Sequence, residues 1–343
     1  MDTMSGSTPR GGRDRRLTTV ALQRRGLLSL AALAGTGQAA QAQDAWAPSQ
    51  PLRLVVTSVA GSTPDLVCRL VAEGMRRLLG PVFVENRPGG FGTIGLLEVV
   101  RARPDGHTLG TGNVVTLAIN DAMLKQQPYA VERDLAPVGL LGFVQNAILL
   151  RPTLEATTLP DLIVLLRAAP GRFTYGSPGI ATTGHLAVEL LASLTGTELV
   201  HVPYRGSPQL VEALRRREVD IACDNLSSLE TLLHAGEARG IAVTGARRTP
   251  LFPDLPTVGE LGWPGFQITS WSGLVVPAAT PGAAVARLNA TVNAALAMPD
   301  ISARLANLAF ETSQGPPQAL FDLAAREKPL WATLIERSGA KVE

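Results

Sequence analysis

Three short turns between Phe173 and Ser228 contain the residues whose types and spacing could do chemistry. Each turn follows a β-rich run, consists mainly of Gly, Ser, Thr, Pro or Asn, and precedes an amphipathic helical pattern. In a parallel α/β sheet such turns meet at the carboxyl ends of the strands. Each helix start then presents unpaired backbone N–H groups and a partial positive charge. The pattern therefore predicts a crevice that binds an anion.

Nucleophilic catalysis is the alternative use of these turns. Ser177 or Ser207, with His185 or His201, would supply a nucleophile and a base. The chain contains no GxSxG elbow, however, and these pairs lack a supporting spacing. We therefore interpret the turns as a binding surface and predict that the protein is not an enzyme. A secreted hydrolase remains an alternative, which a lack of turnover on ester and amide substrates would exclude.

The sequence predicts neither a metal site nor a cofactor. Cys68 and Cys223 are too few for a zinc site, and we expect buried free thiols, with a disulfide as the alternative. The four histidines lack the spacing of a metal-binding helix. The segment from Gly90 to Gly95 matches GxGxxG, but it lies too far from the preceding strand, and the next strand supplies no acidic residue for a ribose. We predict a flexible or hinge-side glycine loop there rather than a dinucleotide site.

Residues 1–42 have the pattern of a secretory signal peptide. Arginines precede an apolar run from Gly26 to Gly35, and Ala40 to Ala42 forms a small-x-small cleavage site. The run is too short for a permanent membrane anchor. We expect export to the periplasm with cleavage after this site. Arg24 and Arg25 leave both the twin-arginine route and the general secretory route open.

Removing this leader changes the charge of the chain. The leader holds six Arg and two Asp, so its loss turns the net charge from +2 to −2. A chain without a basic excess and with few aromatic residues lacks the electrostatic surface of a nucleic-acid-binding protein. The roughly 300 remaining residues suffice for two compact lobes with buried cores. We expect a monomer that binds no nucleic acid.

The elements that would position the turns alternate between strand and helix patterns. A helix is predicted from about Pro64 to Leu79, because Thr63 is a suitable N-cap and Asp65 would lie in the first turn. One or two strands are expected between Leu135 and Leu150. Further strands are predicted at Leu52 to Thr57, Val82 to Glu85, His107 to Ala118, Gly240 to Thr244 and Ser270 to Pro277.

Several ordered blocks of the sequence resemble the extracytoplasmic solute receptors of the tripartite tricarboxylate transporter family, also called Bug receptors. The blocks extend through the whole chain after the leader. They are Glu85 to Gly90, Tyr175 to Gly179, His185 to Ala187, His201 to Ser207, Asp224 and Asn225, Ala242 to Thr244, Phe252 to Val258 and Ser270 to Gly273.

The resemblance implies a two-lobed α/β fold of the Venus-flytrap, type II-like periplasmic binding proteins, with mixed sheets flanked by helices. One lobe would contain residues 43–149 and 275–343, and the other residues 150–274. Such a receptor captures a small organic carboxylate in the periplasm and delivers it to a two-part membrane permease, which it meets transiently. A sensor subunit that binds the same ligand but signals to a two-component kinase is the alternative.

The resemblance also implies which residues hold the ligand. The turn after the first strand and the turn of the second lobe would bind the carboxylate through backbone N–H groups and bridging waters. Residues of the rim would contact the other end of the ligand. The expected ligand-binding residues are Ala60, Gly61, Ser62, Thr63, Asp65, Ser177, Pro178, Gly179, Thr182, Thr183, His185, Tyr204, Asp224 and Asn225.

The first turn departs from the family pattern. Relatives usually have Gly-Gly-Pro-Thr-Asp, often with an aromatic residue a few positions earlier, whereas this chain has Gly61 to Asp65 as Gly-Ser-Thr-Pro-Asp and Ser58 at the aromatic position. Losing a ring over the ligand leaves room. We therefore expect a wider or wetter pocket that accepts a larger or aromatic carboxylate.

Overall fold

The computed structural model describes residues 46–340, and the expected signal peptide lies outside them. A ten-stranded sheet runs through these residues in the order β2-β1-β3-β9-β4-β7-β5-β6, and β8 and β10 each pair with β4. The strands are β1 (Leu52–Val56), β2 (Val82–Asn86), β3 (Thr108–Asn113), β4 (Leu135–Leu150), β5 (Thr174–Ser177), β6 (Val200–Pro203), β7 (Ile221–Asn225), β8 (Arg239–Val243), β9 (Thr269–Pro277) and β10 (Glu311–Thr312). Parallel and antiparallel pairs both occur, which confirms the predicted mixed sheet.

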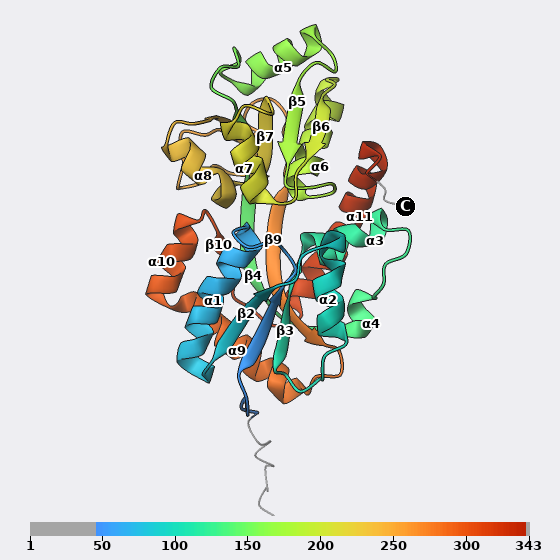
Figure 1. The fold of residues 1–343 in the computed structure, drawn as a ribbon, viewed down its shortest axis with the longest axis vertical. Helices are drawn as coiled ribbons and strands as arrows, with labels where there is room; N and C mark the ends of the chain where they lie inside the picture. The colour runs from blue at the N-terminus through green and yellow to red at the C-terminus, as the bar shows by residue number, and fades with distance from the viewer. Residues whose placement is uncertain (1–45, 341–343) are drawn as a thin grey trace, which may run out of the picture. The chain divides into compact units, whose positions relative to one another are not determined.

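Strand β4 belongs to both halves of this sheet. Its residues Leu135 to Gln145 pair with β9, whereas Asn146 to Leu150 pair with β7 and β8. We call the half with β1, β2, β3, β9 and β10 the β1 lobe, and the half with β5, β6, β7 and β8 the β5 lobe. Figure 1 shows β4 and β9 running together through the middle of the described residues, from one half to the other. The segment expected to hold one or two strands is therefore one continuous strand.

Helices pack on both faces of the β1 lobe (Figure 1). One side carries α1 (Thr63–Leu79), α9 (Gly282–Ala297) and α10 (Pro299–Asn307). The other side carries η1 (Gly90–Gly92), α2 (Thr93–Val100), the π-helix η2 (Val115–Ile119), α3 (Asn120–Met123), α4 (Val131–Asp134) and α11 (Ala319–Ser338). Helices α1 and α9 approach closely, because a Cβ at Gly74 would lie only 2.7 Å from the Ala295 Cβ.

The β5 lobe repeats one local pattern three times. Strand β5 leads into α6 (Thr183–Thr195), β6 into α7 (Ser207–Arg215) and β7 into α8 (Leu226–His234). Strands β6 and β7 each pair in parallel with β5, so the three helix starts lie at the same edge of the sheet. This arrangement confirms the three strand, turn and helix units that the sequence predicts. The remaining helix of the lobe is α5 (Leu159–Ala168), which begins with a Thr158 and Asp161 capping box.

Helix α11 packs against the β1 lobe and also against α6 of the β5 lobe. Trp331 of this helix and Trp271 of β9 are each 1 % exposed or less. Both indole N–H groups donate to the Oε2 atom of Glu327, at 3.0 Å and 2.8 Å respectively. These two hydrogen bonds fix the C-terminal helix α11 to strand β9.

Two local expectations are wrong. The strand predicted from His107 to Ala118 ends at Asn113, because the Asn113 Oδ1 atom accepts hydrogen bonds from the Val115 and Thr116 N–H groups and starts the helical turn of η2. Helix α1 begins one residue earlier than predicted, so Ser62 rather than Thr63 is the N-cap. Both differences move polar groups toward the edge of the β1 lobe that faces the turns of the β5 lobe.

Cys68 and Cys223 are both buried free thiols, as expected from the sequence. No helix in the described part of the chain is long and apolar enough to cross a lipid bilayer.

Candidate functional site

A cavity of about 580 Å³ lies where segments of the β1 lobe meet the turns of the β5 lobe. Its walls come from the ends of β1, β3, β5 and β7, from the glycine loop around η1, and from the turn before α7. The lining residues are Thr57, Ser58, Val59, Ser62, Pro64, Pro88 to Gly92, Asn113 to Thr116, Pro178, Gly179, Ile180, Thr182, Thr183, Arg205, Gly206, Ser207, Asp224, Asn225 and Ser270.

The turn after β1 is held in place by a buried carboxylate. The Asp65 side chain accepts hydrogen bonds from the Gly61 N–H at 2.9 Å, the Asn86 Nδ2 at 2.8 Å and the Arg69 Nε at 3.0 Å. Burial opposes ionisation, but these three hydrogen bonds and the Arg69 charge lower the pKa of Asp65 below its usual value. Asp65 is therefore an ionised positioning residue that shapes the turn, and it does not line the cavity.

The turn after β5 presents the start of α6 to the cavity. Thr182 is the N-cap, and its hydroxyl donates to the Gly179 carbonyl at 2.7 Å. The first intrahelical backbone bond runs from the Leu186 N–H to the Thr182 carbonyl. The N–H groups of Thr183 and Gly184 precede that bond, so they are the ones that a helix start offers to an anion. Gly179 lines the cavity with a φ of +151°.

A stack of rings supports this turn from behind. The His185 ring lies 4.1 Å from the His201 ring, and Tyr175 stacks on His201 at 4.7 Å. The Ser177 Oγ lies 2.7 Å from the His201 Nε2 and donates to the Gly179 carbonyl, while the His185 Nδ1 accepts from the Ala181 N–H.

Burial keeps both rings of this stack neutral. It lowers the pKa of His185 to about 3, with a further contribution from His201, and it lowers the pKa of His201 to about 4. Ser177 is fully buried, and neither histidine lines the cavity. The Ser177 and His201 pair therefore fixes the turn and has no access to a substrate in the cavity.

The end of β7 places two polar side chains in the cavity wall. Asp224 is 3 % exposed and Asn225 is 9 % exposed. The Asn225 N–H donates to the Asp224 Oδ1 at 2.7 Å, but the Asp224 Oδ2 and the Asn225 Oδ1 find no hydrogen-bond partner within residues 46–340. Burial raises the pKa of Asp224 to about 7, although the Asn225 backbone N–H and the nearby Ser207 hydroxyl both favour the ionised form.

One cation and several apolar groups complete the lining. Arg205 is exposed at the rim, and within the described residues no carboxylate pairs with it. Val59, Phe91 and Val115 are among the apolar residues of the walls. A mainly apolar cavity with a few polar groups is typical of a small-molecule site. No group of His, Cys, Asp and Glu that the structure describes is placed to hold a metal ion.

The structure brings half of the expected site residues to this cavity. Those that line it are Ser62, Pro178, Gly179, Thr182, Thr183, Asp224 and Asn225. Those that are not part of its lining are Ala60, Gly61, Thr63, Asp65, Ser177, His185 and Tyr204. The binding role of each residue stays a prediction, but the second group contributes through the turns that it shapes.

Sequence reasoning missed several parts of the lining. Among them are the glycine loop from Pro88 to Gly92, the segment from Asn113 to Thr116, Arg205 and Ser270. The glycines of the loop follow a strand, but the sequence pattern predicts only a flexible or hinge-side loop and assigns it no ligand contact. Arg205 stands beside the expected Tyr204, whose side chain packs into the β5 lobe instead.

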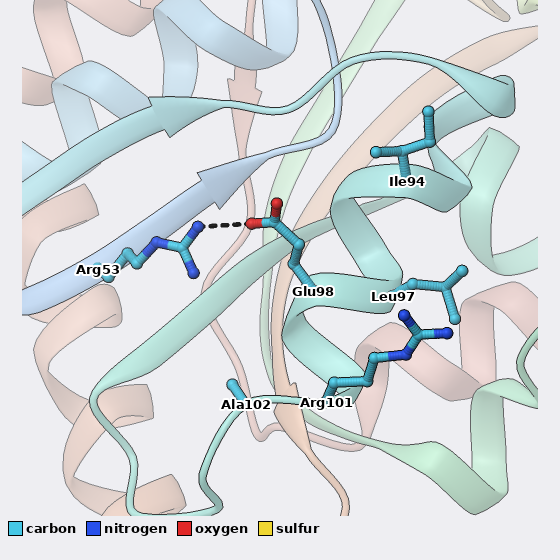
Figure 2. Close-up of a pocket in the computed structure, with 6 residues that line it drawn as sticks. All are labelled: Arg53, Ile94, Leu97, Glu98, Arg101 and Ala102. Carbon is cyan, nitrogen blue, oxygen red and sulfur yellow. Dashed lines mark hydrogen bonds and ion pairs between the residues drawn. The ribbon is translucent and has the colours of Figure 1, made fainter.

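A second hollow, of about 520 Å³, lies on the outside of the β1 lobe beside α2. Figure 2 shows that the Arg53 guanidinium points to Glu98, with Ile94, Leu97 and Arg101 along the helix. Arg53 also pairs with Glu85, at 2.8 Å. Because its inner cation is already neutralised by two carboxylates, this hollow is a weaker candidate for an anion than the cavity between the turns.

Comparison with known proteins gives one matching family and several related solved structures. The family described as tripartite tricarboxylate transporter family receptor matches residues 67–340. A solved protein of R. palustris with adipate is 33 % identical, covers 85 % of this chain and 98 % of its own, and has a TM-score of 0.82. The periplasmic binding protein BugD is 30 % identical, covers 86 % of this chain and 100 % of its own, and has a TM-score of 0.80. MatC of Rhodopseudomonas palustris with bound malate is 30 % identical, covers 84 % of this chain and 99 % of its own, and has a TM-score of 0.78. The predicted two-lobed periplasmic-binding-protein fold is confirmed.

Proposed function

The chain belongs to the tripartite tricarboxylate transporter receptor family, and from this premise we propose that it is a periplasmic receptor for a small organic carboxylate. The receptor binds its ligand in the cavity between the β1 and β5 lobes. It then delivers the ligand to a two-part membrane permease, with which it associates transiently. It performs no chemistry on the ligand.

The observation that carries this proposal is the convergence of two helix starts on one cavity. Ser62 and Pro64 bring the N-terminus of α1 to the wall, and Thr182 and Thr183 bring that of α6. Helix N-termini bind carboxylates through free N–H groups and the helix dipole, without needing a formal cation. The adipate and malate in two related structures are both carboxylates.

The size and lining of the cavity favour a ligand larger than a short dicarboxylate. A volume of about 580 Å³ lies within the usual range for pockets that hold drug-sized molecules. Ser58 stands at the wall where relatives often carry a ring, and Val59 and Phe91 add apolar surface. We infer that an aromatic or long-chain carboxylate fits, with its ring or chain against these side chains.

Closure of the two lobes on the ligand is the mechanism of capture. Thr63 and Ser227 meet across the lobes, and Gly206 allows close approach, since a Cβ there would lie 2.4 Å from the Val59 Cγ2. A ligand that touches both walls binds the closed form more tightly and so shifts the population toward it. The strands β4 and β9, which run from one lobe to the other, are the natural place for the hinge.

A thermal-shift screen of the mature protein against carboxylates tests this function. The panel should contain succinate, adipate, benzoate and phenylacetate, each with its neutral amide as a control. A true ligand at 100 times its dissociation constant raises the free energy of unfolding by about 2.7 kcal/mol, whereas the amides leave it unchanged. Stabilisation by short dicarboxylates alone would contradict the larger ligand, and equal effects of acids and amides would contradict the anion site.

A further inference from the structure

We propose that Asp224 and Asn225 form a hydrogen-bond-accepting subsite that selects carboxylates bearing a second donor group, a hydroxyl or an ammonium, near the carboxylate. This inference rests on the proposed function and adds the feature of the ligand that the receptor reads. Both side chains line the cavity and both are more than nine-tenths buried.

The two side chains present acceptors that the protein itself leaves unpaired. The Asp224 Oδ2 and the Asn225 Oδ1 have no hydrogen-bond partner in the described part of the chain. A buried acceptor without a donor usually destabilises a protein by more than a normal hydrogen bond stabilises it. Since both unpaired atoms are oxygens, only a donor can satisfy them, and a donor on the ligand would do so inside the closed cavity.

The surroundings of Asp224 supply no alternative donor with a charge. On β4 its register partner is Ala147, and α6 presents Gly184, whose Cβ position would lie 3.3 Å from the Asp224 Cα. On α7 the nearby group is the Ser207 hydroxyl, and on β7 it is the Cys223 thiol, which is buried and protonated. No Lys or Arg from these elements lies against the carboxyl group among the residues described.

The subsite also orients the ligand. In its ionised form, Asp224 repels the ligand's carboxylate and so directs it toward the helix starts of α1 and α6, or toward Arg205 at the rim. The donor group then lies at the β7 end of the cavity. A carboxylate without such a donor leaves the acceptors unpaired on closure and binds more weakly.

Two matched ligand series test this subsite on the mature protein by isothermal titration calorimetry. The first is succinate, malate and aspartate, and the second is phenylacetate, mandelate and phenylglycine. Within each series only the group beside the carboxylate changes, from hydrogen to hydroxyl to ammonium. We expect the hydroxy or amino member of at least one series to bind at least tenfold more tightly than its unsubstituted parent.

The Asp224→Asn variant gives the decisive comparison. The amide oxygen can still accept from the Asn225 N–H, as Oδ1 does now, but the second atom becomes a donor instead of an acceptor. The preference for the substituted ligand should fall to about one. The matched control is Asp220→Asn, four residues earlier and outside the cavity, where the carboxylate pairs with Arg151 and Thr174; its preference should equal that of the wild type.

The outcomes separate this inference from the proposed function. Binding of no carboxylate in the two series or in the thermal-shift panel would overturn the proposed function, and the subsite with it. Equal binding of the parent and its substituted partners would overturn the subsite alone. An unsubstituted carboxylate that binds best at pH 5 and loses affinity as the pH rises above 7 would also overturn it, because Asp224 would then act as a protonated donor. Tighter binding of the amino member as the pH rises through 7 would support an ammonium donor.

Discussion

The Thr63 Oγ1 atom lies 2.5 Å from the Ser227 Oγ and 3.1 Å from the Ser228 Oγ. Thr63 stands at the start of α1 in the β1 lobe, and both serines stand in the first turn of α8 in the β5 lobe. This hydroxyl cluster therefore joins the two lobes beside the cavity. Separation of the lobes would break these contacts, so the cluster would favour the form in which the lobes meet.

The Thr63→Ala change should favour the open form. Removing the hydroxyl deletes both cross-lobe hydrogen bonds, each of which contributes about 0.5–1.5 kcal/mol to the closed state. We expect a larger radius of gyration in small-angle X-ray scattering without ligand, and an affinity about threefold to tenfold weaker. The Thr157→Ala protein, with an exposed threonine far from the cavity, is the control. Unchanged scattering and affinity would show that the cluster does not hold the lobes together.

Gly179→Val should weaken capture at the turn after β5. A side chain at this position adopts an unfavourable φ of +151° and places a Cβ at the cavity wall, where the backbone should approach the anion. We expect at least a tenfold loss of affinity by calorimetry. Gly196→Val is a matched control, because Gly196 also has a positive φ but caps the far end of α6 in open space. A folded Gly179→Val protein with wild-type affinity would remove this turn from the site.

Asp65→Asn should lower both stability and affinity. The ionised carboxylate accepts from Gly61, Asn86 and Arg69, and an amide cannot accept all three bonds equally well. Because the folded pKa of Asp65 is lowered, its contribution is present above the unfolded value near 4 and disappears as the pH falls through the folded pKa. Urea unfolding should show a loss of about 1–3 kcal/mol that is constant from pH 5 to 8. A loss that varied within this range would contradict the assignment.

The effect of Asp224→Asn on the stability of the ligand-free protein should, in contrast, change with pH. Burial raises the folded pKa of Asp224 to about 7. The unfolded chain therefore releases this proton at a lower pH, near 4, and Asp224 destabilises the protein increasingly from pH 4 to above 7. The variant has no ionisable group here and so lacks this pH-dependent destabilisation. Its free energy of unfolding relative to the wild type should therefore rise between pH 5 and 8. A difference that stays flat with pH would mean that Asp224 is ionised already at pH 5.

The sequence predicts the position of a site residue where local patterns determine it, and fails where packing between distant segments determines it. The three strand, turn and helix units of the β5 lobe follow from local patterns, and so does the position of Gly179 and Thr182 at a helix start. His185 lies only three residues beyond the N-cap, yet its ring points back into a stack with His201 and Tyr175. That direction depends on how α6 packs against β5 and β7, which no local pattern contains.

The missed parts of the lining have the same cause. Asn113 and Ser270 stand on β3 and β9, whose antiparallel pairing places Asn113 opposite Ser272, but this pairing joins segments more than 150 residues apart. Their place beside the turn of α6 follows from β4 and β9 running from one lobe to the other. The resemblance to a family supplied that architecture, whereas periodicity and capping alone predict the elements but not their order in the sheet.

A crystal structure of the mature protein with the most stabilising carboxylate tests most directly whether the two lobes hold a carboxylate between them. We predict that the carboxylate oxygens accept hydrogen bonds, directly or through one water, from the free backbone N–H groups at the starts of α1 and α6. Ligand density outside the cavity lined by Ser62, Gly179 and Asp224, or in contact with one lobe only, would contradict it.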